Sequence, residues 1–368
     1  MLDVGCHSAS LLVVERRPST PLRPVFTHKV RLRLHERVDA SGRIRPPGVR
    51  EVRRGVAEAL RAAREVAPPG LFPFATSVIR DAPNGDEVVS VVARETGTHL
   101  RFLDGEEEAR LAYVAARRWF DSPAGGMLLL DIGGGTVEIA AGGGSYGCRP
   151  GGAVGPAIAL SLPLGARRIT LDWFREGPVT ARRVAAVREH LAQTLTAVPS
   201  LPRADGTALP VGCSKALQQL ARLTANGRPA LRGDGSARPG RRRGGDRRPR
   251  KPRAGGKGAG GAERLLREGC GRAADGADRL RLEELRHWIP VLAATPAHRR
   301  AELPGISRHR AEQSLAAALV AEALMTACGV DELRVSPWST AQGLLLELLD
   351  AAEAGAAAGV DADYRMAG

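Results

Sequence analysis

The sequence has no apolar run that approaches the length of a membrane span, which takes about 20 residues. Near its start, Asp3 follows Met1 almost directly, so the basic and then apolar pattern of a signal peptide is missing. We therefore expect a cytoplasmic protein without a membrane partner. The 368 residues are enough for two domains, since single domains usually hold about 100–200 residues.

Cysteine is also scarce. The five cysteines are Cys6, Cys148, Cys213, Cys270 and Cys328. They are scattered, odd in number and without the spacing of metal ligands, which argues against a disulfide framework and against a zinc site. We expect free thiols.

Acidic side chains are nearly absent from residues 228–257. This segment holds 12 basic and 2 acidic residues, which leaves +4 of the formal net charge of +14 for the rest of the chain. The wider region 228–278 is rich in Gly, Arg and Pro, and its few apolar residues cannot offset the entropy lost on folding. We expect a disordered basic insert there. Such a segment can contact nucleic acid nonspecifically, but it has no aromatic residues to stack on bases, so we do not favour that partner.

Elsewhere, patterns of strands and helices alternate along the chain. Residues 49–66 place apolar side chains at helical spacing, residues 71–80 read as a strand and a loop, and a helix is expected from residue 307 onward. This alternation predicts an α/β fold.

The run "MLLLDIGGGTVEIAAGGG", residues 127–144, combines two apolar strands with a glycine turn. Three consecutive glycines are costly in backbone entropy, so they indicate positive φ angles or the close approach of another group. Their N–H groups suit an anion, and Asp131 and Glu138 suit a cation beside it. The same residues also fit an ordinary glycine hairpin with two surface acids.

A similar pattern opens the chain. An apolar start is followed by Asp3, by Gly5 in a short polar turn, and by a second apolar run at residues 11–14, about 130 residues before the glycine run. Two copies of this pattern predict a duplicated fold whose halves face each other. Two unrelated hairpins remain an alternative.

Taken in order, the motifs resemble the exopolyphosphatase / guanosine pentaphosphate phosphohydrolase (Ppx/GppA) family. The matching segments are "LDVGCHSASLLVVE", "RLRLHERVDASGRI", "FATSVIRDA", "ETGTHLRFLDGEEEARLAY", "LLLDIGGGTVEIA", "SLPLGARRIT", "RRAELPGISRHRAEQSLAAALV" and "ELRVSPWSTAQGLLLELL". They cover almost the whole chain outside the basic insert, as in the short family members that lack a C-terminal HD-type domain.

The resemblance implies an actin-like, Hsp70-like, sugar-kinase fold, in which two α/β domains with duplicated β-sheet cores enclose a cleft. We place domain I at residues 1–117, domain II at 118–350 with the insert at 228–278, and a flexible tail at 351–368. The implied activity is hydrolysis of the terminal phosphoanhydride of inorganic polyphosphate, or of guanosine pentaphosphate, with Mg²⁺ or another divalent cation. A homodimer is implied as well.

The family pattern also implies roles for single residues. Asp131 and Glu138 match the metal-associated carboxylates, Glu108 matches the general base, and Arg80 matches an arginine that faces the phosphates. The phosphate-binding residues match in two loops: Asp3, Gly5, Cys6, His7 and Ser8 in the first, and Gly133, Gly134, Gly135 and Thr136 in the second.

These roles agree with the needs of phosphoryl transfer to water. The phosphate must be held in line, its charge neutralised and the attacking water oriented. Arg80 supplies a bidentate cation and Glu108 a proton acceptor. For Glu106 and Glu107, a solvated helix start is the preferred interpretation.

The first loop departs from the family, which commonly has DxGSNS or DxGSNT. Here Cys6 and His7 replace a hydroxyl and an amide. This difference keeps a second class open, a polyphosphate-binding protein with little turnover. An actin-like ATPase or sugar kinase is disfavoured by "GEEEARL" and "SLPLGA".

Overall fold

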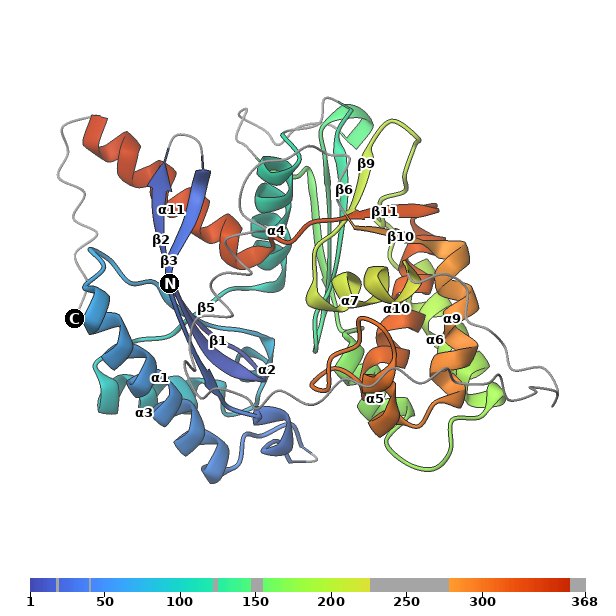
Figure 1. The fold of residues 1–368 in the computed structure, drawn as a ribbon, viewed down its shortest axis with the longest axis horizontal. Helices are drawn as coiled ribbons and strands as arrows, with labels where there is room; N and C mark the ends of the chain where they lie inside the picture. The colour runs from blue at the N-terminus through green and yellow to red at the C-terminus, as the bar shows by residue number, and fades with distance from the viewer. Residues whose placement is uncertain (18–19, 40, 122–124, 147–154, 226–277, 358–368) are drawn as a thin grey trace, which may run out of the picture.

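The computed structural model describes residues 1–17, 20–39, 41–121, 125–146, 155–225 and 278–357. The basic insert, except Asp278, lies outside these ranges, as do Cys148 and Cys270. Two sheets with helices on both faces form two lobes (Figure 1). No helix in the described ranges is long and apolar enough to cross a membrane.

The first sheet has the strand order β3-β2-β1-β4-β5. Its strands are β1 (Leu2–Val4), β2 (Ser8–Arg17), β3 (Thr20–Arg31), β4 (Pro73–Ala75) and β5 (Arg101–Phe102). Strands β1 to β3 pair antiparallel, whereas β4 runs parallel to β1 and to β5. The helical segments of this part are η1 (Leu34–Glu36), α1 (Pro46–Val66), α2 (Ser77–Arg80), α3 (Gly85–Thr96) and α4 (Gly105–Trp119).

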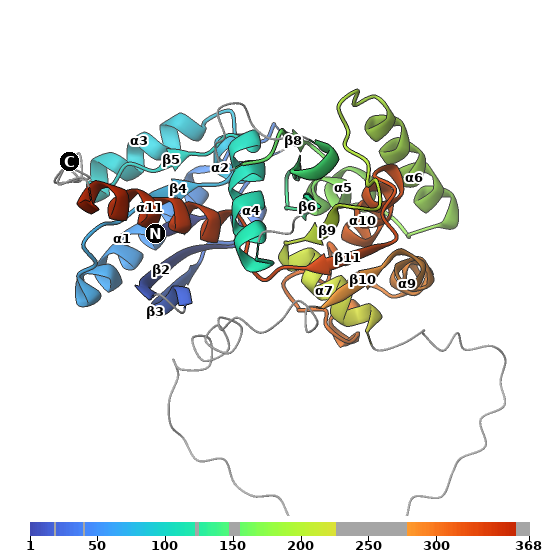
Figure 2. The same ribbon diagram turned by 90° about the horizontal axis from the view of Figure 1, so that it is seen from above.

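Side chains of the first sheet enter two cores. On one face Leu2, Val4 and Leu11 pack with Val52 and Val56 of α1 and with α3. On the other face, the core contains Phe74 of β4 with residues of α4 and of the last helix, α11 (Thr340–Ala357). The sheet is therefore covered on both sides, and α11 brings the end of the chain back to the N-terminal lobe (Figures 1 and 2).

The second sheet has the order β10-β11-β9-β6-β7-β8. Its strands are β6 (Met127–Ile132), β7 (Val137–Gly142), β8 (Ile158–Leu162), β9 (Leu209–Gly212), β10 (Arg279–Arg281) and β11 (Glu332–Val335). The remaining helical segments are η2 (Gly144–Tyr146), α5 (Ala166–Trp173), α6 (Ala181–Thr196), α7 (Lys215–Thr224), α9 (Leu282–Ala294), η5 (Ala297–Glu302) and α10 (Ser314–Ala327).

Every residue of β6 is buried because both faces of this strand are covered. Met127 and Leu129 pack with Ala112 and Tyr113 of α4. Leu128 and Leu130 alternate to the opposite face and pack with the helices of the C-terminal lobe. Since Leu111 contributes to the core beside the first sheet, α4 lies between the two sheets (Figure 1).

The two sheets share one topology, which confirms the predicted duplication. On one side of each sheet, three consecutive strands pair antiparallel. They are β1, β2 and β3 in the first sheet and β6, β7 and β8 in the second. Parallel strands follow on the other side, β4 and β5 in the first sheet and β9 and β11 in the second. The domain boundaries at residues 117 and 350 stay a prediction.

Several local expectations need correction. The segment expected as a loop before Arg80 contains the short helix α2, and the helix expected from residue 307 begins only at Ser314, after a series of turns. Helix α11 continues to Ala357, so the start of the expected tail at residue 351 is helical, and residues 358–368 lie outside the described ranges. The structure adds β3, β8 and α5, which the sequence patterns did not predict separately.

Candidate active site between the lobes

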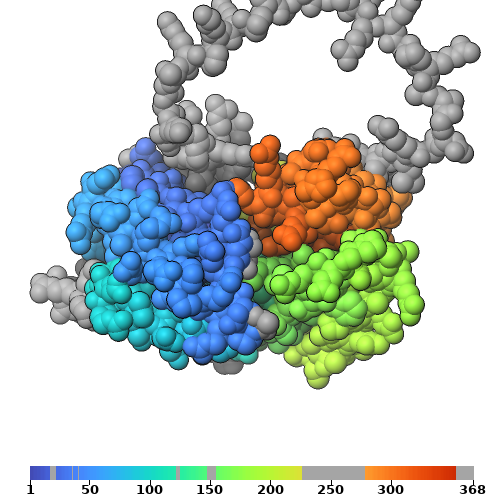
Figure 3. Space-filling view, turned by 90° about the horizontal axis from the view of Figure 1, so that it is seen from below, coloured from blue at the N-terminus to red at the C-terminus, as the bar shows by residue number. Residues whose placement is uncertain are grey.

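A cleft of about 520 Å³ lies between the two lobes and is lined by residues from both. The space-filling view shows the blue to cyan N-terminal half and the green to orange C-terminal half meeting along one boundary (Figure 3). Of the predicted site residues, the following line the cleft: Asp3, Gly5, Cys6, His7, Ser8, Gly134 and Gly135. The lining does not include the predicted residues Arg80, Glu108, Asp131, Gly133, Thr136 and Glu138. Arg80 and Asp131 contact residues that do line the cleft, Asp81 and Cys213.

The first loop follows β1 and is closed by a hydrogen bond from the Gly5 N–H to the Ser8 carbonyl at 2.9 Å. The carbonyl oxygens of Cys6 and His7 accept from the N–H groups of Leu34 and Leu32, so β3 and its extension hold the loop in place. These contacts hold the loop at the C-terminal end of β1, where the side chains of the loop line the cleft.

Asp3 is the middle residue of β1 and lines the cleft. Its Oδ1 is buried and has no hydrogen-bond partner among the described residues. Burial raises the pKa of Asp3 to about 6, and the charge of Lys29 partly opposes this rise. A buried carboxylate oxygen left unpaired in this way is costly unless a ligand or cation satisfies it.

The second loop joins β6 and β7 and is closed by the Gly133 N–H, which donates to the Thr136 carbonyl at 2.9 Å. None of Gly133, Gly134 and Gly135 has a positive φ. A Cβ on Gly133 would lie 3.0 Å from the Thr136 carbonyl oxygen and one on Gly135 would lie 3.1 Å from Oγ of Ser77, whereas one on Gly134 would meet only Cβ of Arg167 at 3.8 Å. Close approach is tightest at Gly165, where a Cβ would lie 2.4 Å from the carbonyl carbon of Gly135 and 2.5 Å from that of Gly134.

The N–H groups at the start of α5 hold the second loop in place by donating to the carbonyl oxygens of that loop. The N–H groups of Gly165, Ala166 and Arg167 donate to the carbonyls of Gly135, Gly133 and Gly134 at 3.1, 3.0 and 2.9 Å. The loop thereby satisfies N–H groups at the helix start that would otherwise need other partners.

The N–H groups of the second loop are left for a ligand. Among the described residues, those of Gly134 and Gly135 donate to no backbone carbonyl, and both glycines line the cleft. Such donors in a glycine turn are suited to an anion.

Asp131 and Glu138 are directly opposite each other in the β6–β7 pair, so both side chains lie on the same face of the sheet. Asp131 accepts a hydrogen bond from the Cys213 thiol at 3.1 Å, and Glu138 accepts one from the Ser161 hydroxyl at 3.2 Å. Burial raises the pKa of both carboxyl groups, and for Glu138 the charge of Asp131 adds to the rise.

Glu108 lies in the first turn of α4, and Asp104 caps that helix by accepting from the Glu107 N–H at 2.7 Å. Glu108 accepts from Nη1 of Arg80 at 2.7 Å. Burial raises the pKa of Glu108 to about 7; Arg80 lowers it, and Asp131, Asp81 and Asp3 raise it. The site thus places a carboxyl group that titrates near neutrality next to several other carboxylates.

Arg80 is held in place by three acceptors. Besides Glu108, it donates from Nη1 to the Leu103 carbonyl at 2.7 Å and from Nε to Asp81 at 2.9 Å. Within the described part of the chain, Nη2 of Arg80 donates to no protein acceptor.

Asp131 and Glu138 offer carboxylate oxygens, the kind of ligand that a hard divalent cation takes. In the described ranges no three His, Cys, Asp or Glu side chains could hold a metal by themselves. Magnesium commonly takes only one or two carboxylates and completes its shell with water and substrate phosphates. The donor set therefore matches a cation that binds together with a phosphate.

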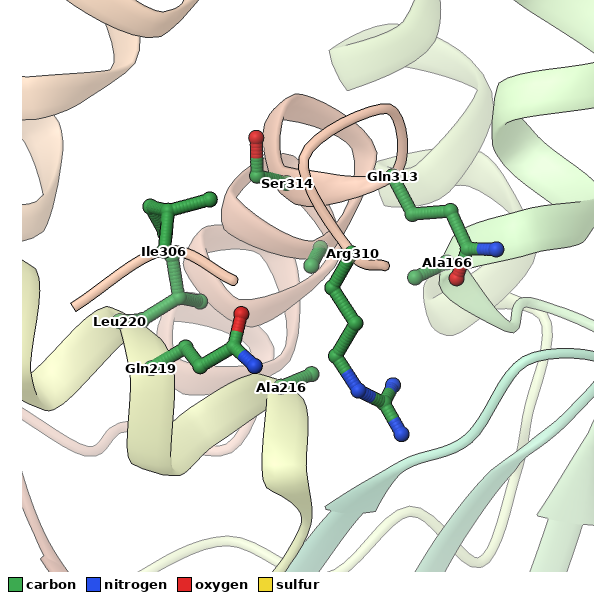
Figure 4. Close-up of a pocket in the computed structure, with 9 residues that line it drawn as sticks. Ala166, Ala216, Gln219, Leu220, Ile306, Arg310, Gln313 and Ser314 are labelled. Atoms are coloured by element: carbon green, nitrogen blue, oxygen red, sulfur yellow. The ribbon is translucent and has the colours of Figure 1, made fainter. Parts of the chain in front are cut away.

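The sequence analysis missed cations that the structure brings to the cleft. Lys29, Arg167 and Arg310 all line it. Arg310 comes from the turns before α10, and Figure 4 shows its side chain extending between Ala166 and Ala216; these residues also line a small cavity of about 10 Å³. The segments "SLPLGARRIT" and "PGISRHRAEQS" carry Arg167 and Arg310, but neither pattern indicates that the fold brings them to one cleft.

The fold and the site define a class: an α/β protein with two similar lobes, two glycine-bearing loops at one cleft, and carboxylates of the kind that suit a divalent cation. The profile of the Ppx/GppA phosphatase family matches residues 12–233 and 256–352. The chain belongs to this family, which confirms the predicted enzyme class, a hydrolase of phosphoanhydride bonds.

Curated relatives and solved structures agree with this assignment. Exopolyphosphatase 1 of Mycobacterium tuberculosis is 36% identical over 359 residues, which cover 97% of this chain and 90% of the relative. Exopolyphosphatase 1 of Mycobacterium leprae is 35% identical over 358 residues, which cover 97% of this chain and 91% of the relative.

Two solved structures share the fold. A Ppx/GppA family member of Aquifex aeolicus has a TM-score of 0.68 at 22% identity and covers 95% of this chain and 97% of its own. An exopolyphosphatase of Cytophaga hutchinsonii has a TM-score of 0.68 at 17% identity over the same shares. The predicted actin-like, two-domain fold is thereby confirmed.

Proposed function

We propose that the protein is an exopolyphosphatase that removes the terminal phosphate from short chains of inorganic polyphosphate. The observation that carries the proposal is Glu108, whose pKa near 7 suits a general base at neutral pH, next to two phosphate loops at one cleft. The similarity to the mycobacterial enzymes named exopolyphosphatase 1 supports the choice of substrate.

The terminal phosphate is bound by the open N–H groups of Gly134 and Gly135 and by the first loop. Nη2 of Arg80 binds one of its oxygens, while the other atoms of this guanidinium keep their contacts with Glu108 and Asp81. Asp131 and Glu138 would hold Mg²⁺, and the cation would supply neutralisation of the charge on the phosphate oxygens.

Glu108 orients the attacking water and takes its proton. In its ionised form it accepts this proton as the oxygen of the water bonds to phosphorus and the bridging oxygen leaves with the shortened chain. The charge of Arg80 favours the ionised form of Glu108 despite its burial, because the cation lowers the pKa that burial raises.

The test is phosphate release by the purified full chain with magnesium. We expect turnover of tripolyphosphate and of longer polyphosphate, with single phosphates as the product. Guanosine pentaphosphate offered in competition separates the alternative substrate: a higher kcat/KM for the nucleotide would overturn the proposed one. Tight polyphosphate binding without any release would favour a binding protein.

A further inference from the structure

Helix α11 brings the chain from the second sheet back to the helix that carries Glu108. It follows β11, and the connection between the two elements lines the cleft through Pro337 and Ser339. In both ribbon views the start of α11 lies beside α4 (Figures 1 and 2). A segment far from Glu108 in the sequence therefore meets the helix of the proposed base.

The two helices are in close contact at Leu111 of α4. Leu111 is fully buried and shares a core with Leu345 and Leu346 of α11. A Cβ on Gly343 would overlap the carbonyl oxygen of Leu111, so the two backbones approach each other at a distance that only glycine allows. The first turns of α4 are therefore packed directly against α11.

The first residue of α11 contacts the backbone of the proposed base. Oγ1 of Thr340 donates to the carbonyl oxygen of Glu108 at 3.3 Å. The carboxylate of Glu108 accepts from Arg80 at 2.7 Å. Glu108 is thus held at both ends, by Thr340 at its carbonyl group and by Arg80 at its side chain.

Arg110 joins the first turn of α4 to a second point on α11. It donates to both carboxylate oxygens of Glu107 at 2.7 Å each, and to those of Glu347 at 2.5 and 2.6 Å. Such bidentate pairs fix the orientation of the partners as well as their distance. The side chain of Arg110 is only 16% exposed, so solvent ions screen the pair with Glu347 less than they screen a pair at the surface.

We propose that Thr340 and Glu347 are positioning residues for Glu108, which hold the first turn of α4 where its carboxylate reaches the attacking water. This inference rests on the proposed function, because that function makes Glu108 the base. A displacement of about 1 Å can lower a rate about a hundredfold. The loops assigned to the phosphates belong to other elements, so loss of either residue should lower kcat and leave KM nearly unchanged.

The first experiment measures phosphate release from tripolyphosphate by the full chain with magnesium. Thr340→Val keeps the shape of the side chain without its hydroxyl, and kcat should fall about fivefold, the scale of one hydrogen bond, with KM within about twofold. Thr340→Ser keeps a donor and should recover most of kcat. The control is Thr194→Val, which removes a hydroxyl that donates to a backbone carbonyl in α6 and should leave kcat unchanged.

The second experiment tests the contact through Arg110. Glu347→Gln should lower kcat about threefold at an unchanged KM, the scale of a partly exposed ion pair. The matched control is Asp350→Asn on the same helix, since Asp350 pairs with Arg16 and with Arg118 near the other end of α4. Equal losses of kcat in Glu347→Gln and Asp350→Asn would mean that α11 acts only by its general packing, and would overturn the role of Glu347.

An unchanged kcat in Thr340→Val, or a loss that Thr340→Ser does not restore, would overturn the role of Thr340 while the proposed function stands. If wild type released no phosphate, the proposed function would fail, and amide hydrogen exchange of residues 105–112 would still test the restraint on this turn. Faster exchange there in Thr340→Val than in wild type and Thr194→Val supports the restraint, and equal exchange refutes it.

Discussion

Arg80 donates from Nη1 to Oε1 of Glu108 at 2.7 Å, and the two residues come from different helices, α2 and α4, of the N-terminal lobe. The contact couples a permanent cation to the proposed base. Burial of Glu108 favours its neutral form and Arg80 favours its charged form, and the balance sets the pKa at about 7.

The pH dependence of the reaction should report this pair. Since ionised Glu108 is the active form, kcat/KM should rise with pH and level off above about 7. Replacing Arg80 by Gln removes the charge that lowers this pKa, so the inflection should move to higher pH while the plateau falls. Steady-state rates from pH 5.5 to 9 measure both effects, and an unmoved inflection would contradict the coupling.

Glu108→Gln should lower kcat/KM by about a hundredfold or more, the magnitude expected for loss of a general base. The matched control is Glu106→Gln, an exposed acid in the same first turn of α4, which should keep the rate within about twofold, because exposed substitutions away from a site have small effects. Circular dichroism confirms that both variants fold. Equal losses in the two variants would remove Glu108 from the role of base.

The metal-free protein should lose stability as the pH rises. The pKa of Asp3 is about 6 when folded, above its usual value of about 3.9, so the folded state binds more protons between these values. The free energy of unfolding that protonated Asp3 contributes at pH 4 is therefore lost as the pH rises through about 6.

Thermal unfolding of wild type and Asp3→Asn between pH 4 and pH 8 tests this linkage. The variant, which cannot ionise, should gain stability relative to wild type as the pH rises, whereas the exposed substitution Asp172→Asn should show no such trend. Magnesium at pH 8 should raise the melting temperature of wild type, because a ligand that binds the folded state stabilises it. If the difference in melting temperature between wild type and Asp3→Asn were the same at every pH, this result would count against the raised pKa of Asp3.

The thiol of Cys213 should position Asp131, since it donates a hydrogen bond to this carboxylate at 3.1 Å. Cys213 directly follows β9 in the chain. Cys213→Ala removes the donor and should raise the magnesium concentration for half-maximal activity about tenfold, within the range for residues that orient a metal ligand. Cys213→Ser retains a donor and should recover most of this loss. Cys328→Ala, at another buried free thiol, is the control, and the same rise in all three variants would refute a specific role.

Gly165→Ala should destabilise the protein by about 1–3 kcal/mol, as expected for overpacking, because its Cβ would meet the backbone of Gly134 and Gly135 at about 2.5 Å or less. Gly70→Ala is the matched control, since nothing lies within 4 Å of a Cβ at that position. Urea unfolding measures both. An unchanged midpoint for Gly165→Ala would show that the second loop yields to α5 at little cost.

Local sequence patterns predicted the elements around the site because short-range physics determines them. The apolar alternation on either side of the glycine run predicted β6, the turn and β7, and the acidic first turn predicted the start of α4. The reason for the glycines was only partly predictable. Their φ angles are ordinary, and the group that approaches them, Gly165, lies beyond a further strand.

The class of elements, the duplication and the set of candidate phosphate-site residues could be predicted from the sequence alone, since a strand with a glycine turn needs only neighbouring residues to be recognised. Which charged groups meet depends on how the whole chain folds. Asp3, Glu108 and Asp131 come from separate elements, and their pKa values depend on burial and on one another. Arg31 and His309 are 278 residues apart, and no local pattern can report an encounter that requires both lobes to have folded.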